Sequence, residues 1–435
     1  MGLIALPPDY LQLNKRIPFG VYDAYGRLLV AAGHCIGDEK KLGVLQRREL
    51  FVDEDEAGAL RQSLHQSASS LIRNNATLEV IAAARLSPRA PGHMHRPMAR
   101  PVVREELPTP SPATLTPHHD PHAPRLPTFG REGTLAQRCA TIVQALGSAL
   151  REAEADPHWL RRVHAVHEGL REYIEYHRNA ALYLLFQHAG HSNEHYSSHH
   201  ATLCTVICES VSKALGWQPE ARLRIARAAL TMNVAMTQLQ DTLAMRDDPL
   251  RPVHKQQLAS HSQRSADLLS KAGVEDEIWL NIVRQHHDTA LAAAPLPSLD
   301  PTQRMTRLLM SVDRFSARIS RRGSRSPQSP LIAARDLCVG EDGLPDEFGA
   351  AILRVVGMYP PGSYVRLVNG ELAVVLAPGR RMNQPLVAVI QGSSGLALND
   401  PILRDTALPG REVVEAVPVA QVRVSVNPDR ALALT

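Results

Sequence analysis

The feature that most constrains the fold is a helical repeat of apolar residues running through residues 133–325. Apolar side chains spaced i, i+3, i+4 and i+7 form one stripe on a helix, and such a stripe must pack against another element. The first two stripes comprise Leu135, Cys139, Ile142, Val143, Leu146 and Leu150, then Leu160, Val163, Val166, Leu170 and Ile174. Further helices are expected at 198–215, 219–236, 253–271, 275–287 and 301–320. The pattern predicts a helical domain over residues 129–330.

A small α/β module is expected ahead of this domain, within residues 1–86. Residues 19–30 are typical of two short strands around a turn at Asp23 to Gly26. Asp38 is a suitable cap for a helix over 39–47, and Leu50 begins a third strand. Another helix is predicted over 56–85.

Residues 87–128 are interpreted as a linker. Eleven of the 32 prolines fall between residues 87 and 127, together with His118, His119 and His122. A proline-dense segment lacks the apolar content for a packed core and favours extended chain. Capture of a metal ion by its histidines is an alternative to a solvated spacer.

The tail, residues 331–435, changes character. A helix is expected at 346–356, and strand-like runs follow it at 364–368, 371–376 and 385–390. Asn369-Gly370, between the first two runs, is a strong hairpin signal. We therefore expect a helix and a small β appendage after the helical domain, in a chain that is mainly α.

Composition narrows the choice of partner and compartment. The net charge is only +4, from 48 basic and 44 acidic residues that are interspersed, which argues against nucleic acid as a ligand. The basic run at 318–326 has no interleaved aromatic residues and is interpreted as a solvated loop. No apolar run approaches the ~18 residues that span a bilayer. Five scattered cysteines favour a reducing compartment. These observations predict a cytoplasmic protein that does not enter a membrane.

Each candidate metal ligand falls on a predicted helix or at a helix end. The candidates are His200, His261, His286, His287 and Asp313. Helices of a bundle can direct such side chains into one shared site. Neighbours on a helix point about 100° apart, so the His286-His287 pair suggests one ligand and one further contact. With 20 histidines in the chain, the alternative is that these are packed or surface side chains.

Residues 196–320 resemble the HD-GYP domain, a subclass of the HD phosphohydrolases. The run HATLC from His200 is similar to the family's H-S-x-x-V, and residues 217–233 align with a segment ending in L-H-D. Residues 261–269 are similar to H-P-x-x-G-x-x-L-L, residues 285–288 to H-H-E, and residues 309–315 to V-x-D-x-Y/F. Residues 356–370 resemble an extension that follows many of these domains, and the N-terminal module resembles one often found ahead of them. The resemblance covers most of the chain outside the linker.

The resemblance implies a helical HD-like fold and a specific chemistry. Active HD-GYP domains are phosphodiesterases of cyclic di-GMP that hold two or three iron or manganese ions, and a bridging hydroxide attacks the phosphorus. The family's HD aspartate bridges the metals and its HD histidine holds one of them. Such cations activate the nucleophile and stabilise the charge on the leaving oxygen.

This chain departs from the family at the positions that carry that chemistry. The His-Asp pair is replaced by Met232-Asn233, the phosphate-contacting lysine falls at Met236, and no G-Y-P follows Asp288. The family's additional glutamate would fall near Tyr196. Methionine is a soft ligand and asparagine carries no charge, so neither suits iron or manganese. At most one divalent ion is expected, for example on His261 with His286 or His287.

Two functions follow. The first is a catalytically degenerate regulatory protein of cyclic di-GMP-related signalling that binds an unidentified protein or a nucleotide such as cyclic di-GMP, with a homodimer left open. The alternative is a metal-dependent phosphohydrolase with a reduced site. Cys204 and Cys208 lie one and two turns beyond His200. They are interpreted as buried free cysteines, with a soft metal site as the alternative.

Overall fold

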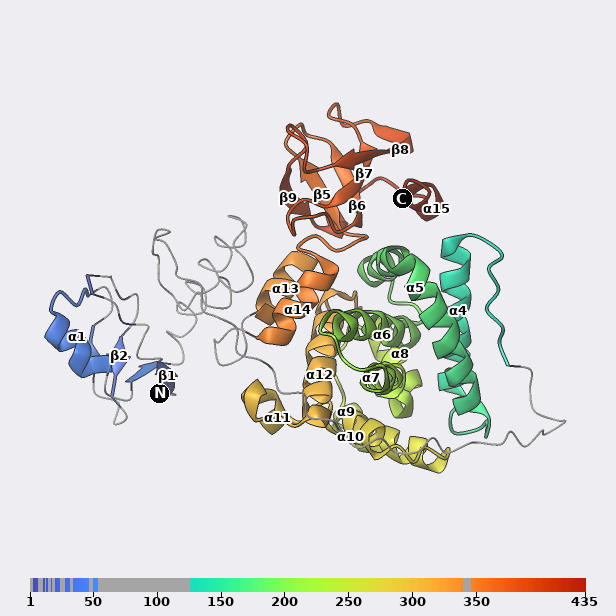
Figure 1. Cartoon of the computed structure of the whole chain (residues 1–435), viewed down its shortest axis with the longest axis horizontal. Helices are drawn as coiled ribbons and strands as arrows, with labels where there is room; N and C mark the ends of the chain where they lie inside the picture. Colours follow the sequence, from blue (N-terminus) through green and yellow to red (C-terminus); the bar gives the residue numbers. More distant parts are fainter. Residues whose placement is uncertain are drawn as a thin grey trace.

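The computed structural model describes residues 126–338 and 346–435, together with short segments between residues 3 and 53. The predicted helix at 56–85 and nearly all of the predicted linker lie outside the described residues. The expectation of a mainly α chain with a small N-terminal sheet and a C-terminal β appendage is confirmed (Figure 1).

The N-terminal module is a small sheet with one helix. Its strands are in the order β1-β4-β2-β3, and each contact between neighbours is antiparallel. Val21 and Val52 are fully buried in its own apolar cluster. The sequence did not predict β1, which pairs with β4. The elements are β1 (Leu3–Leu6), β2 (Val21–Tyr22), β3 (Leu28–Val30), α1 (Glu39–Gln46) and β4 (Leu50–Asp53).

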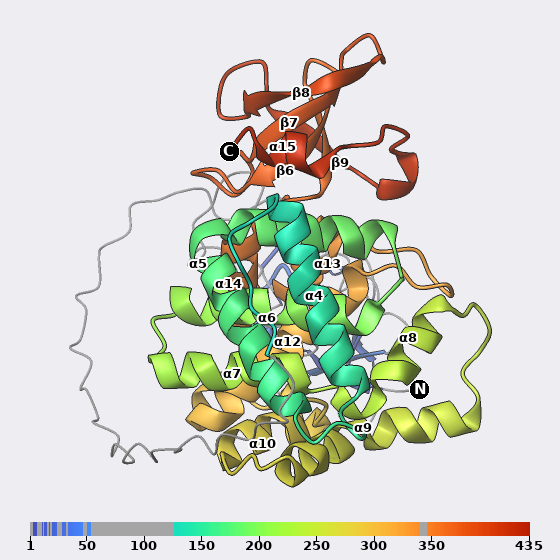
Figure 2. The ribbon, with the colours of Figure 1, turned by 90° about the vertical axis from the view of Figure 1, so that its right-hand side faces the viewer.

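The helical domain is built around α6 (Tyr196–Ala214), which is buried along nearly its whole length. Figures 1 and 2 show it among α4, α5, α7, α12 and α14, and it contacts each of them. Its polar residues are tolerated in the core because their hydroxyls bond carbonyls one turn back, as in Thr202 to Ser198 (2.7 Å) and Thr205 to Ala201 (2.8 Å). The surrounding helices are α4 (Leu135–Arg151), α5 (Trp159–His191), α7 (Pro219–Thr231), α8 (Thr237–Met245), α9 (Pro252–Lys271), α10 (Glu277–Gln285), α11 (Thr289–Ala293), α12 (Pro301–Ile319), α13 (Pro330–Cys338) and α14 (Glu347–Val356).

Helix ends agree with their sequence signals at several places. Thr134 and Asp300 each form a capping box with a glutamine three residues on. Asp276 caps α10, where it accepts from the backbone of Ile278 and Trp279. These caps fix where the site-bearing helices α10 and α12 begin.

The predicted helix over 219–236 is wrong at its C-terminal end. α7 ends at Thr231, a short 3-10 turn covers Val234–Met236, and α8 begins at Thr237. The break has a tertiary cause, because the Ala235 amide donates to Ser265 Oγ on α9 (3.2 Å) instead of to a carbonyl of its own helix. Met232 and Asn233 therefore occupy a turn between two helices.

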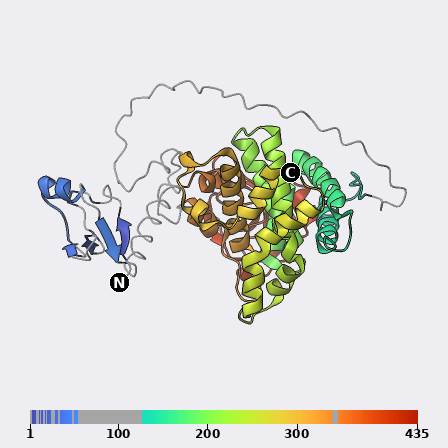
Figure 3. The same cartoon turned by 90° about the horizontal axis from the view of Figure 1, so that it is seen from below.

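The C-terminal appendage is a five-stranded antiparallel sheet in the order β8-β7-β6-β5-β9. It covers one end of the helical domain, opposite α9 and α10 in Figure 1, and is largely hidden behind the helices in Figure 3. Tyr183 of α5 packs against Tyr364 and Val374. The strands are β5 (Tyr364–Leu367), β6 (Leu372–Ala377), β7 (Leu386–Gln391), β8 (Ala397–Asp405) and β9 (Val413–Val417), followed by α15 (Pro428–Leu432).

In the part of the chain that the structure describes, no helix is both long enough and apolar enough to cross a membrane.

Candidate functional site

The structure gathers the five predicted ligands into two neighbouring groups. His261, His286 and His287 form one, and His200 and Asp313 form the other together with Cys204. Within each group the ligand atoms lie within 4.8 Å of one another. The groups are electrostatically linked, because His286 and His287 both help to keep Asp313 ionised. The spacing argument therefore selected residues that do converge.

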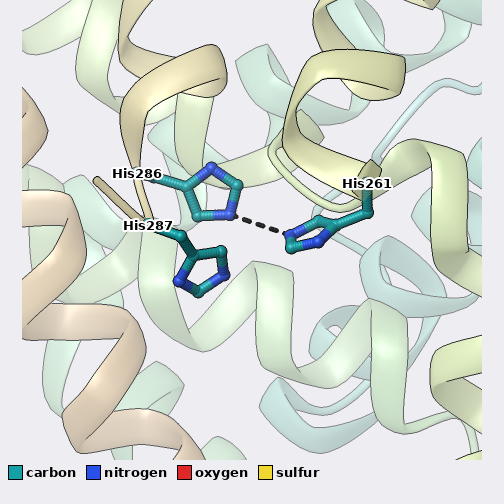
Figure 4. A group of neighbouring side chains, drawn as sticks. All are labelled: His261, His286 and His287. Atoms are coloured by element: carbon teal, nitrogen blue, oxygen red, sulfur yellow. Dashed lines mark hydrogen bonds between the residues drawn. The ribbon is translucent and has the colours of Figure 1, made fainter. Parts of the chain in front are cut away.

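The three-histidine group is formed where α9 passes the end of α10. His261 lies on α9, and His286 and His287 directly follow α10 (Figure 4). His261 and His286 are almost completely buried, whereas His287 is exposed. The predicted helix 275–287 is two residues too long at each end, since α10 covers Glu277–Gln285. Both histidines of the pair turn toward His261, with ring centroids 5.1 Å and 5.0 Å from it.

Hydrogen bonds fix the orientation of two of these rings. His261 Nδ1 lies 2.5 Å from the carbonyl of Leu258, and His286 Nδ1 lies 2.6 Å from that of Val283. Each Nδ1 must carry the proton, because a carbonyl oxygen only accepts. The two Nε2 atoms, 3.2 Å apart, therefore face each other with lone pairs. Backbone contacts of this kind set the tautomer of metal-binding histidines.

This geometry suits a metal ion. In a tetrahedral centre with metal–nitrogen bonds of about 2.0–2.1 Å, neighbouring nitrogens lie about 3.3 Å apart. Burial lowers the pKa of His261 and, with the charge of His287, lowers that of His286 to about 3. Both imidazoles are neutral at neutral pH, which is the form that binds metal.

The second group joins α6 to α12. His200 Nε2 lies 2.7 Å from Asp313 Oδ1 and 3.6 Å from Cys204 Sγ. Burial opposes charge on His200, but Cys204 and Asp313 together raise the pKa of this imidazole. Burial likewise opposes ionisation of Asp313, yet the hydrogen bond from His200 keeps the pKa of this carboxyl below its usual range. Burial raises the pKa of the Cys204 thiol. Without a cation the group is an imidazolium–carboxylate pair beside a neutral thiol.

Met232 and Asn233 do not replace the chemistry of a His-Asp pair. Met232 is completely buried and belongs to the apolar core. Asn233 precedes the turn to α8, and its Oδ1 is buried without a hydrogen-bond partner among the described residues. An unpaired buried oxygen is costly, by about 1–3 kcal/mol, but it carries no charge to hold two cations together.

The other divergent positions have structural roles. Asp288 caps α11, where it accepts from Ala290 (2.8 Å) and Leu291 (3.2 Å). The Tyr196 ring stacks on His200, and its hydroxyl oxygen accepts from Arg322 (2.7 Å). Met236 is buried. No carboxylate or lysine side chain therefore lies at Tyr196 or Met236.

The residues of these two groups do not fit a centre that holds two iron or manganese ions. Asp313 is the only carboxylate in the two groups identified among the described residues. It is already hydrogen-bonded to His200. Two adjacent cations need a shared anionic ligand, and the position where the resembled family places it holds Asn233.

A cavity of about 370 Å³ lies next to the site. Its lining includes Tyr196, Met236 and Leu258, the residue whose carbonyl orients His261. Arg246 and Arg322 lie on its wall with Asp247 and Asp248. The volume lies in the range of small-molecule sites, about 300–1,000 Å³. No sequence motif indicates this cavity, because its lining comes from α6, α8, α9 and the loops that follow α8 and α12, which are distant in the chain.

Three of the four arginines in the basic run at 318–326 make contacts within the protein, while residues 323–326 are exposed to solvent. Arg318 bonds Asp336 (3.5 Å), Arg322 bonds Tyr196, and Arg325 donates to the carbonyl of Ala317.

Within the histidine run at 188–200, His188 and His199 stack on each other, with ring centroids 3.3 Å apart. His200 is the residue of this run that faces Asp313.

Comparisons with known proteins give little further information. No protein-family profile matches the chain, and no curated protein matches it. Among solved structures, it is similar to the Bdellovibrio bacteriovorus protein Bd1817, described as an HDG"Y"P protein. The two share 14% identity over 81% of this chain and 98% of that one, with a TM-score of 0.40.

Proposed function

We propose that this chain is a catalytically silent, HD-GYP-like regulatory protein. The proposal rests on the chemistry and the environment of Met232 and Asn233. The methionine is fully buried in the apolar core, and the asparagine offers only a neutral amide where the two-metal mechanism needs a bridging anion. Each ~1.4 kcal/mol of lost transition-state stabilisation lowers the rate tenfold, so losing the second metal removes most of the catalysis.

The regulatory role would be exercised by binding. The 370 Å³ cavity beside Tyr196 and Met236 is large enough for a small molecule, and its wall carries Arg246 paired with Asp248 and Arg322 bonded to Tyr196. Cyclic di-GMP is the first ligand to test, and a protein partner or a second copy of the chain is the next. We place the protein in the cytoplasm, in agreement with its sparse cysteines.

The test is a phosphodiesterase assay on the full chain, loaded anaerobically with manganese or iron(II) and given cyclic di-GMP. The expected result is no turnover above that of His286→Ala, with binding of the intact nucleotide measured separately by calorimetry. Turnover that His286→Ala abolishes would refute the silent-regulator proposal.

A second candidate rests on a different observation. The 3.2 Å separation of His261 Nε2 and His286 Nε2 suits one metal ion, and a single bound ion can activate water for hydrolysis of another phosphoester. We expect this function only if metal is present in the protein purified without chelators. A chain that purifies metal-free and cannot be reconstituted would eliminate this candidate.

A further inference from the structure

Cys204 brings a sulfur ligand into a site where the HD-GYP resemblance implies iron or manganese. It lies four residues after His200 on α6, so the two side chains occupy the same helix face. Asp313 reaches them from α12. Cys208, one turn further on, is equally buried but is not part of the group. The packing of α12 against α6 therefore distinguishes the two cysteines.

The distances in this group approach those of a tetrahedral metal centre. With bonds of about 2.0–2.1 Å to nitrogen and about 2.3 Å to sulfur, the nitrogen–sulfur separation is about 3.6 Å. His200 Nε2 and Cys204 Sγ lie 3.6 Å apart. Nitrogen and carboxylate oxygen would lie about 3.3 Å apart around a metal. The hydrogen-bonded His200–Asp313 pair, at 2.7 Å, would have to open by about 0.6 Å.

We propose that His200, Cys204 and Asp313 form a binding site for one thiophilic divalent cation of the zinc class, with Cys204 as a thiolate ligand. Thiolate favours zinc and other soft or borderline ions, whereas manganese prefers carboxylate, carbonyl and water oxygens. The poor fit to an iron or manganese pair then reflects a change of metal. A bound cation would link α6 to α12 and so stabilise the helical domain.

Binding of the cation to this site releases two protons. The cation displaces the proton of the Cys204 thiol, and the imidazolium proton of His200 leaves with it, so both go to solvent as metal–sulfur and metal–nitrogen bonds form. Asp313 enters as the carboxylate that it already is. His200 and Cys204 are closed to solvent, while the Asp313 side chain is 17% exposed. A fourth ligand from water would enter on the Asp313 side.

The experiment is titration of the chelator-treated full chain with cobalt chloride, followed by zinc chloride. A cobalt–thiolate bond gives a charge-transfer absorption in the near ultraviolet that cobalt on three histidines does not give. We expect this band in the wild type, its loss on zinc addition and its absence in Cys204→Ala. The matched control Cys208→Ala removes an equally buried thiol from the same helix and should keep the band.

A wild-type protein that binds cobalt without the band would overturn the proposal, as would a band that survives Cys204→Ala or vanishes in Cys208→Ala. Should Cys204→Ala fail to fold, Asp313→Asn decides the matter, because it preserves shape while removing the anionic ligand. It should weaken zinc binding at least about tenfold, or about 1.4 kcal/mol, and unchanged affinity would contradict the site. Phosphodiester turnover is scored separately, so this proposal and the silent-regulator proposal can fail independently.

Discussion

The Nε2 atoms of His261 and His286 face each other at 3.2 Å, and the Nδ1 atom of each ring is held by a backbone carbonyl. Neither Nε2 carries a proton in this arrangement, so two lone pairs are held together in a buried space. A divalent cation would turn this repulsion into two coordinate bonds. The pair is the strongest geometric argument for metal binding at the three-histidine group.

Replacing His286 with alanine should therefore reduce metal binding at the three-histidine group. Removal of one of three ligands is expected to weaken affinity at least about tenfold. The protein is equilibrated with a limiting concentration of free metal ion, and the content of bound metal is then measured by mass spectrometry. His254→Ala is the control, because His254 lies on α9 with His261 but belongs to neither donor group. Equal losses in both variants would show that the three-histidine group does not hold the metal.

Introducing the His-Asp pair of the resembled family, with Met232→His and Asn233→Asp, should raise the number of manganese ions that the chain retains. The same change should destabilise the metal-free protein by about 1–3 kcal/mol, because Met232 is fully buried and imidazole would bring unsatisfied polar atoms into the core. Thermal unfolding with and without manganese checks both effects. A double variant that gains no stabilisation from manganese would mean that the HD position no longer faces the ligands.

The helices were predictable because their apolar stripes are long, whereas the turn at Met232 was not. Residues 232–236 are locally compatible with helix, and the break depends on Ser265, a residue 30 positions away. β8 escaped notice because its exposed sequence includes Asn399, Asp400 and Pro401 and becomes a strand only by pairing with β7.

The site was predictable to the level of its histidines. Spacing on predicted helices selected His261 and His286, but no sequence rule indicates that their lone pairs face each other. Helical spacing placed Cys204 and Cys208 on the same helix face as His200, one and two turns away. The position of Asp313, which only the packing of α12 defines, separates them.

His164 should make the protein less stable in mild acid. Burial, with the charges of Arg227 and His167, lowers its pKa from 6.5 to about 4. The unfolded chain therefore binds a proton between these values that the folded chain does not, so stability falls as pH decreases from 6.5 toward 4. At pH 5 the loss from this residue is at most about 2 kcal/mol. The raised pKa of His200 acts in the opposite direction only above about pH 6.5, so the effect of His164 is isolated by comparing variants.

The comparison uses His164→Gln, which cannot titrate, and measures the free energy of unfolding by denaturant at pH 7.5 and pH 5. The variant should lose less stability than the wild type between these two values. Identical losses would show that His164 takes up its proton without opening the packing around Trp279, whose ring centroid lies 5.9 Å away.

We expect Gly362, unlike Gly395, to be essential for the packing of the C-terminal sheet against α5. Both adopt positive φ, +88° and +82°, so alanine at either costs about 1–2 kcal/mol in backbone strain. A Cβ at Gly362 would also lie 2.6 Å from the backbone oxygen of Tyr183, whereas one at Gly395 meets nothing within 4 Å. Because Tyr183 belongs to a helix packed in the core, relief requires the sheet to move, which adds about 1–3 kcal/mol. Denaturant unfolding should therefore rank Gly362→Ala well below Gly395→Ala in stability. Equal values would mean that the sheet and α5 shift apart at little cost, and that the contacts of Tyr364 with Gln187 contribute little to holding them together.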